Sequence, residues 1–308
     1  MRKEDILKDP KLLKRFCKDA NLPINIYENP YFIERLEAIN PVFSSINKFE
    51  LFAKELRSFN NTQDYFEYYN SLKDIIIFDI KNNPYFEAFN TGSFSWQNLK
   101  YQYSNKDFYK MPLNGQSIIS IDMKKANFSA LSVFDKRIFG NAESWEEFIG
   151  RYTCYKHIVN SKYIRQVVMG TCNPKRQVAY EKYLMGTLLE YLKREMDIHV
   201  FSFSSDEIII IPDSSDVISF YNTISERVNN WEHSDIVRIS VFTLTKLPVT
   251  DGWKREIFNG ETTEMDFKKM PAEYYHMAVK HEFGIPITED DLTFYHDGKL
   301  ARFLEPVF

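Results

Sequence analysis

The sequence predicts an α+β protein in which an antiparallel sheet carries helices on one face. Three observations favour this class. Short apolar runs of strand length, Ser117 to Ile121 and Ile208 to Ile211, each lie beside acidic residues. Between these runs, apolar residues recur at helical spacing. A polar turn joins His199 to Phe203 with the second run, and this pattern predicts a β-hairpin.

Residues 1–112 are expected to form a helical N-terminal domain. Apolar residues recur at helical spacing, and prolines interrupt the pattern at Pro10, Pro23, Pro30 and Pro41. One buried strand is expected here, from Ile75 to Ile80, because its apolar run is closed by an Asn-Asn-Pro sequence. The polar and aromatic residues 89–116 predict a boundary that ends near Gly115.

Beyond this boundary, strands and helices are expected to alternate. The first strand ends at Asp122 and a helix follows it, and two more helical segments are expected between about Trp145 and Met196. After the hairpin, the pattern predicts a helix and two strands, and then helices around Pro271 and Pro286. The predicted ranges are Asp216 to Trp231 for that helix, and Ile236 to Leu247 and Trp253 to Phe258 for the strands.

Composition excludes several classes of protein. The chain has 308 residues, of which 44% are hydrophobic, and a net charge of -4, as expected for a globular protein of about two domains. No apolar run approaches the roughly 20 residues of a membrane span, and the charged first residues do not resemble a signal peptide. We therefore expect no membrane partner and a cytoplasmic location, or the host cytoplasm if the chain is from a phage or virus. The cysteines and histidines lack zinc-site spacing.

Asp122 and Asp206 are the candidate catalytic pair. Each ends or interrupts an apolar run, which places its carboxylate at a strand edge. Two carboxylates from adjacent strands suit a pair of divalent cations about 4 Å apart, because Mg²⁺ prefers hard oxygen ligands. Such a site, together with cations for a triphosphate, is sufficient for phosphoryl transfer.

The order of these features resembles the palm domain of template-dependent nucleic-acid polymerases. The residues from Asp122 to Ser129 are similar to motif A, and Ser205-Asp206-Glu207 is similar to the motif C hairpin tip of family A DNA polymerases. Between them, Lys162 to Gly170 has the spacing of the family B fingers pattern Lys-x-x-x-Asn-Ser-x-Tyr-Gly. Gln166 and Met169 depart from that pattern, and the resemblance covers roughly residues 113–256.

The resemblance implies specific roles. Asp122, Asp206 and the Met123 carbonyl would hold Mg²⁺ or Mn²⁺, with Glu207 beside them as a third catalytic carboxylate. Lys162 and Arg165 would bind the incoming triphosphate, in a substrate site that includes Gly170. Asn127, with Phe128 next to it, occupies the position that senses the sugar 2′ substituent, and its polar side chain leaves ribose and deoxyribose both open.

Local charge supports a nucleic-acid partner. Residues 151–200 contain nine Lys and Arg against four Asp and Glu, a net charge of +5 in an acidic chain. Such a basic segment suits phosphate contact. The residues expected to contact the nucleic-acid backbone are Lys175, Arg176, Lys246 and Lys254.

These observations predict a polymerase that extends a 3′-hydroxyl with nucleoside triphosphates, as in DNA replication. The palm would comprise residues 113–145 and 196–256, the fingers-like helices 146–195, and a small helical, thumb-like segment 257–308. Two other functions remain open: a two-metal nuclease or phosphodiesterase, and a non-catalytic nucleic-acid-binding protein with a palm-like fold.

Each motif also has a structural interpretation. Asp122 alone is typical of a solvated strand end, and Ser205-Asp206-Glu207 alone is typical of a turn. Lys162 and Arg165 could form a solvated helix face, and Asn127 could bond the local backbone at a helix start. The functional prediction therefore depends on finding these residues together.

Overall fold

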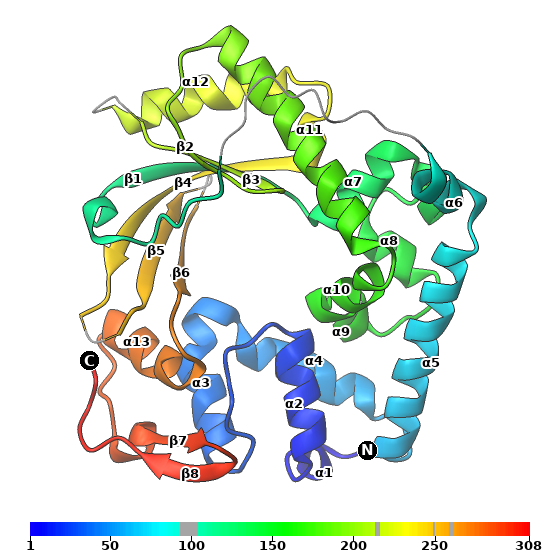
Figure 1. Ribbon diagram of the computed structural model, residues 1–308. Helices are drawn as coiled ribbons and strands as arrows, with labels where there is room; N and C mark the ends of the chain where they lie inside the picture. The colour runs from blue at the N-terminus through cyan, green and yellow to red at the C-terminus, as the bar shows by residue number, and fades with distance from the viewer. Residues whose placement is uncertain (93–103, 213–215, 249, 259–261) are drawn as a thin grey trace.

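Figure 1 shows a computed structural model of the chain, which describes residues 1–92, 104–212, 216–248, 250–258 and 262–308. Within those residues the chain forms thirteen α-helices, one six-stranded antiparallel sheet and a two-stranded hairpin. The predicted α+β class is therefore confirmed. No helix in the same residues is long and apolar enough to cross a bilayer. Part of the predicted boundary segment, 93–103, lies outside the described residues.

Six helices form the described N-terminal part, as the helical spacing predicted. Local capping explains where several of them begin: the Asp9 side chain accepts hydrogen bonds at the start of α2, and the Asn61 side chain does so at the start of α5. Pro41 does not break a helix but lies inside the last turn of α3. The helices are α1 (Lys3–Ile6), α2 (Pro10–Asp19), α3 (Tyr31–Phe43), α4 (Ser45–Leu56), α5 (Thr62–Lys81) and α6 (Pro84–Thr91).

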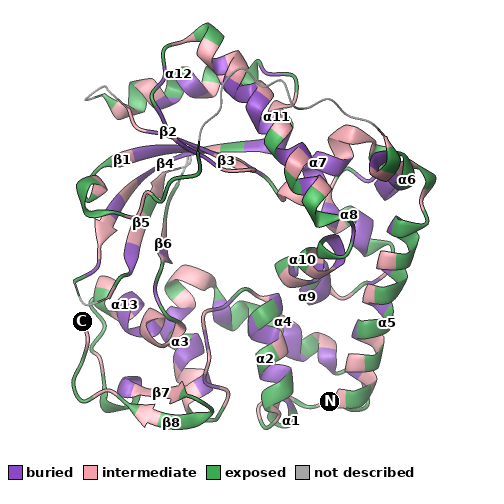
Figure 2. Cartoon of the chain, in the orientation of Figure 1, coloured by how far each residue is buried: buried purple, intermediate pink, exposed green. Residues whose placement is uncertain are grey.

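The predicted strand from Ile75 to Ile80 is wrong, because these residues form the last turns of α5. The buried residues of α5 are Tyr65, Tyr69, Leu72, Ile76 and Ile80, spaced three or four apart as in one face of a helix. Figure 2 shows buried and exposed residues alternating along α5. Two apolar residues of the run are solvent-facing: Ile75 is 52% exposed and Phe78 is 65% exposed. The prediction followed the short apolar run and overlooked the spacing of three or four residues that recurs along the whole helix.

The six-stranded sheet has the order β2-β3-β1-β4-β5-β6, with every neighbouring pair antiparallel. The predicted strand at Asp122, the hairpin and the two later strands are confirmed, and β6 was not predicted. The strands are β1 (Ser117–Met123), β2 (Val200–Phe203), β3 (Glu207–Ile210), β4 (Val237–Lys246), β5 (Trp253–Phe258) and β6 (Thr263–Lys268).

The two faces of the sheet differ in what covers them. Ile119, Ile121 and Met123 of β1 belong to the main core, together with the buried residues of the helices packed on that face. The alternate residues of β1 face the other side, where Ile118 joins a smaller cluster partly covered by Phe108 and nearby aromatic residues. Because successive strand residues point to opposite faces, Ser120 and Asp122 also lie on this second face.

The helices α7–α11 lie between β1 and β2. The interval that was predicted to hold two helical segments contains four helices, because short turns break the first segment twice. Its long final helix packs against α7 and α12 and approaches β3. The helices are α7 (Ala126–Phe134), α8 (Trp145–Gly150), α9 (Lys156–Val159), α10 (Lys162–Gly170) and α11 (Pro174–Glu195), and α12 (Val217–Asn229) follows β3.

The predicted helical character of residues 257–308 is only partly correct. Strand β6 extends the sheet, and α13 (Tyr275–Glu282) is the one α-helix among the described residues of this segment. A small hairpin, β7 (Thr293–His296) and β8 (Lys299–Arg302), follows it. Pro271 and Pro286 lie outside α13.

The N-terminal helices pack against two other parts of the chain, the C-terminal segment and the helices α9 and α10. Helix α3 packs on α13, whereas α4 packs on α9, and both α2 and α5 pack on α10. Figure 1 shows this arrangement, with α2–α4 between the C-terminal segment and the helices α9 and α10. The N-terminal part therefore supports helices that belong to the candidate site described next.

Candidate active site

Strand pairing brings Asp122 and Asp206 to the same end of the sheet, where β1 ends and the β2–β3 turn lies. Asp122 is opposite Glu207 in the β1–β3 register, and the Met123 N–H donates a hydrogen bond of 2.8 Å to the Asp206 carbonyl. The turn is fixed by Ser204, whose N–H donates to the Glu207 carbonyl and whose hydroxyl accepts from the Glu207 N–H. Asp122 and Asp206 thus lie on backbone segments that are hydrogen-bonded to each other, at the end of β1 and in the β2–β3 turn.

The carboxylates at this end of the sheet are electrostatically crowded. Burial raises the pKa of Asp122; Arg238, at 2.8 Å, opposes this shift, and the charge of Asp206 adds to it. Burial also raises the pKa of Glu207, although its Oε1 accepts a 2.6 Å hydrogen bond from the Ser120 hydroxyl. A bound cation would reduce the electrostatic repulsion between these negative groups in a partly buried site.

A cleft of about 1300 Å³ opens beside these carboxylates. Its walls are the end of β1, the β2–β3 turn and parts of α7, α8, α10 and α11. It is lined by eight of the predicted site residues: Asp122, Met123, Asn127, Phe128, Lys162, Arg165, Gly170 and Asp206. Residues from three separate stretches of sequence are therefore gathered in one cavity.

Three cations that line this cleft form no ion pair with a described residue: Lys124, Lys162 and Arg165. Lys124 instead donates a hydrogen bond to the Asp235 carbonyl, whereas Lys125, Lys136 and Arg238 each form an ion pair with a carboxylate. Burial lowers the pKa of Arg165, and its Nε atom is buried without a hydrogen-bond partner. Lys162 and Arg165 are therefore suited to an anionic ligand.

The N-terminal helices fix the start of the helix that carries Lys162 and Arg165. The Ser161 hydroxyl caps α10 by accepting from the Ile164 N–H at 3.1 Å, and it donates to Asp19 of α2 at 2.7 Å. One helix earlier, Glu55 of α4 accepts from the backbone N–H groups of Lys156 and His157. Carboxylates of residues 1–92 therefore position both α9 and α10.

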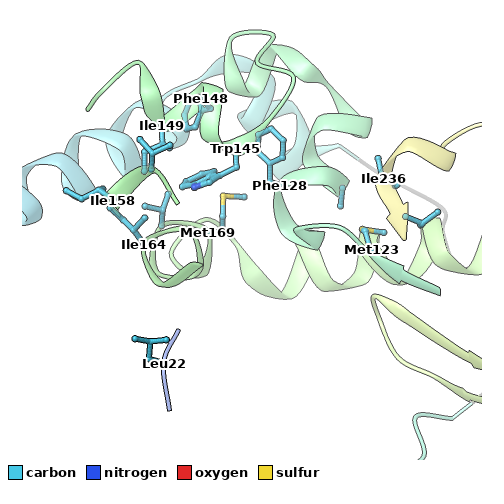
Figure 3. Packing of buried hydrophobic residues seen from close by; sticks show 14 of the residues in the cluster. Leu22, Met123, Phe128, Trp145, Phe148, Ile149, Ile158, Ile164, Met169 and Ile236 are labelled. Carbon is cyan, nitrogen blue, oxygen red and sulfur yellow. The ribbon is translucent and has the colours of Figure 1, made fainter. Parts of the chain in front are cut away.

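The predicted sugar-sensing residues have different environments. Asn127 is half-buried, and its side-chain oxygen accepts from the Phe128 N–H at 3.0 Å, which is the local bond of the structural interpretation. Phe128 is only 5% exposed, and its ring lies 4.6 Å from Phe139 and 6.3 Å from Trp145. Figure 3 shows Phe128 beside Trp145 in this apolar cluster. Most of the Phe128 ring is thus core, and only its edge borders the cleft.

Other predicted residues lie outside the cleft lining. Lys175 is exposed, and Arg176 donates to the Gly92 carbonyl. Lys246 donates to the Thr250 carbonyl, and Lys254 forms a 2.8 Å ion pair with Glu282. The lining of the cleft contains none of these four cations, of which Lys175 and Arg176 were predicted from the basic segment and Lys246 and Lys254 from position. Glu207, which is opposite Asp122 in the β1–β3 register, also lies outside the lining.

Sequence analysis missed Glu181 on α11. Its side chain lines the cleft and is 5% exposed, and burial, followed by the charge of Asp206, raises its pKa to about 7. The signal was its spacing: Glu181 lies on the same buried stripe of α11 as Gln177, Leu184 and Leu188. A carboxylate on an apolar stripe indicates either a buried partner or a ligand.

The oxygen donors at this end of the sheet suit Mg²⁺ or Mn²⁺. Among the described residues, no group of three or more His, Cys, Asp or Glu side chains converges closely enough to hold a metal alone. Mg²⁺ commonly binds through one or two carboxylates and completes its shell with water and substrate phosphates. Asp122 and Asp206 therefore fit a cation that binds together with a phosphate-bearing substrate.

We compared the chain with protein-family models, curated proteins and solved structures, and it matches none of them. Its function must therefore be argued from the cleft itself.

Proposed function

We propose that the chain is a metal-dependent nucleotidyltransferase, a polymerase that extends a 3′-hydroxyl with nucleoside triphosphates on a template. In this proposal the six-stranded sheet acts as the palm and the helices α8–α11 act as the fingers. One observation carries the proposal. The crowded carboxylates Asp122 and Asp206 share a single cleft with Lys162 and Arg165, which lack ion-pair partners among the described residues.

This combination suits phosphoryl transfer for an electrostatic reason. Nucleoside triphosphates carry several negative charges, and binding them requires cations that are not already neutralised. Lys162 and Arg165 lie three residues apart on α10, so both side chains can lie on one helix face and contact one triphosphate. Bound Mg²⁺ would lower the pKa of the attacking 3′-hydroxyl and neutralise the departing pyrophosphate.

The chain's own residues would bind and orient the reactants. Asp122 and Asp206 would offer oxygen ligands from two strands whose register holds them together. Arg238 has a side chain that is 62% exposed, so its ion pair with Asp122 can open at little energetic cost. The freed guanidinium would then be available to a phosphate. Asn127, on the first turn of α7, would contact the sugar.

The direct test is nucleotide incorporation. Wild type, Asp122→Asn, Asp206→Asn and the exposed control Asp251→Asn are incubated with Mg²⁺ and a labelled oligonucleotide. Primed and unprimed strands are each tested with the four ribonucleotides and the four deoxyribonucleotides. We expect wild type and the control to lengthen the strand, and both cleft variants to fall to background while their melting temperatures stay at or above that of wild type.

The remaining outcomes each contradict the proposal in a recognisable way. Full activity in either cleft variant would show that the replaced carboxylate is not needed for catalysis. Shortening of the oligonucleotide without nucleotides identifies a two-metal nuclease, which has no triphosphate for Lys162 and Arg165 to bind. Oligonucleotide binding that survives EDTA, with no turnover under any condition, identifies a non-catalytic binding protein.

A further inference from the structure

Glu181 lines the cleft from α11. On α11, Pro174, Gln177, Val178 and Glu181 all line the cleft, and their spacing places them on one face of the helix. Glu181 is the acidic member of this face, and its side chain is more than nine-tenths buried. Asp206 lies close enough for its charge to act on the ionisation of Glu181.

Glu181 has no partner within the described part of the chain. No hydrogen bond or ion pair joins its carboxylate to any residue there, although Glu181 is only 5% exposed. By contrast, Gln177, one turn earlier, donates its amide hydrogens to the carbonyls of Met169 and Cys172. A buried carboxylate without a partner is destabilising, so its placement at the cleft wall indicates a ligand that enters the cleft.

The ligand must suit two negative groups that do not converge on one point. Asp206 and Glu181 repel each other, which favours a cation between them. The described residues contain no three carboxylates close enough to coordinate one ion directly, so Glu181 is not placed as an inner ligand. Mg²⁺ and Mn²⁺ retain several water molecules, and carboxylates commonly hold such waters from an outer position.

Building on the proposed function, we propose that Glu181 is an outer ligand of the divalent cation held by Asp122 and Asp206. Its carboxylate accepts hydrogen bonds from water molecules bound to that cation. The helix α11 thereby contributes to a metal site whose direct ligands come from the sheet. Glu181 is in this sense a positioning residue, because it acts on the substrate through the cation and its water.

The test measures metal binding rather than turnover. Mn²⁺ is titrated by calorimetry at about pH 8 into the full chain saturated with a non-hydrolysable nucleoside triphosphate, for wild type, Glu181→Gln, Asp206→Asn and Glu195→Gln. The last variant is the matched control, since Glu195 is an exposed glutamate at the end of the same helix, outside the cleft lining. We expect Glu181→Gln to weaken Mn²⁺ binding by about 10- to 100-fold, Asp206→Asn to abolish it, and the control to match wild type.

Failure of the inference is distinguishable from failure of the proposed function. If Asp206→Asn loses the site but Glu181→Gln binds Mn²⁺ as tightly as wild type, Glu181 has no role at the cation and only the inference is overturned. If wild type and Asp206→Asn bind Mn²⁺ equally, the proposed metal centre itself is wrong.

A second variant covers the case in which Glu181→Gln does not fold. Glu181→Asp keeps the charge but withdraws the carboxylate by one methylene group. We expect it to bind Mn²⁺ more weakly than wild type, because the hydrogen bonds to the cation's water depend on position. Wild-type affinity in Glu181→Asp would overturn the inference.

Discussion

Asp291 and Glu55, which lie where the N-terminal helices contact the rest of the chain, are held differently from Glu181 in the cleft. Asp291 accepts hydrogen bonds from Lys280 and from Thr288, and lies 3.5 Å from Arg35. Glu55 accepts from two backbone N–H groups and from the ring of His157. In the cleft, Glu181 has no such partner within the described residues.

The pKa shifts record the same difference. At Asp291 and Glu55 burial opposes ionisation, but the hydrogen bonds outweigh it, so both pKa values are lowered. At Asp19, which accepts from Ser161, burial prevails and the pKa is raised. At the cleft carboxylates Asp122 and Glu181, and at Glu207 opposite Asp122, burial prevails and like charges add to it, so their pKa values are raised. Ionised Asp291 and Glu55 therefore stabilise the fold, whereas ionisation of Asp122 and Glu181 is disfavoured unless a ligand enters the cleft.

The largest expected effect concerns the cations. Replacing both Lys162 and Arg165 with alanine removes two charge-assisted contacts to a triphosphate. We expect the KM for nucleotide to rise by about 10²-fold or more, with little change in stability. Steady-state kinetics measure this, with the exposed Lys182→Ala, also on a cleft helix, as the control. An unchanged KM would show that these cations belong to a solvated helix face.

A substitution at Asp291 should change the free energy of unfolding rather than the kinetics. Asp291→Asn leaves Arg35 and Lys280 beside a neutral amide in a buried site, because Asp291 is 1% exposed. We expect a loss of about 3–5 kcal/mol in the free energy of unfolding, measured by urea denaturation. Asp122→Asn should lose far less than this. Equal losses in the two variants would abolish the distinction between Asp291 and the cleft carboxylates.

Glu181 provides a pH test of the same contrast. Its pKa is raised from 4.5 to about 7, so the folded state binds the proton more tightly than the unfolded chain does. Wild-type stability should therefore fall as pH rises from about 4.5 to about 7. We expect metal-free Glu181→Gln to exceed wild type by up to about 3 kcal/mol at pH 8, with the gain absent near pH 4. A gain that does not vary with pH would contradict this account.

The smallest effect tests how α10 is supported. Ser161→Ala removes both the helix cap and the hydrogen bond to Asp19, whereas Ser144→Ala removes only the cap of α8. We expect about 1 kcal/mol for the Ser144 variant and a larger loss for the Ser161 variant, by chemical denaturation. Equal losses would mean that the link to α2 adds nothing to stability.

Sequence patterns predicted the end of the sheet at Asp122 and Asp206 well because its signals are local. The apolar run before Asp122 and the polar turn at Asp206 specify strand ends, and their antiparallel pairing brings the two residues together. Lys162 and Arg165 could likewise be placed on a helix by spacing alone. The strand expected from Ile75 to Ile80 failed because a four-residue apolar run does not distinguish a strand from part of a buried helix.

Other features depend on tertiary contacts that sequence does not reveal. Phe128 was expected to contact the sugar, but Phe139 and Trp145 enclose most of its ring. Lys246 and Lys254 were placed by position, and their local partners became visible only in the folded chain. Glu181 was overlooked because its neighbours in space, including Asp206, lie on a different element.

The central claim is that the cleft binds a divalent cation and a triphosphate at the same time. Anomalous diffraction from crystals grown with Mn²⁺ and a non-hydrolysable nucleoside triphosphate tests it most directly. The account predicts a manganese peak coordinated by both Asp122 and Asp206, with the phosphates directed toward Lys162 and Arg165. A peak that contacts neither carboxylate, or a nucleotide bound outside this cleft, would contradict it.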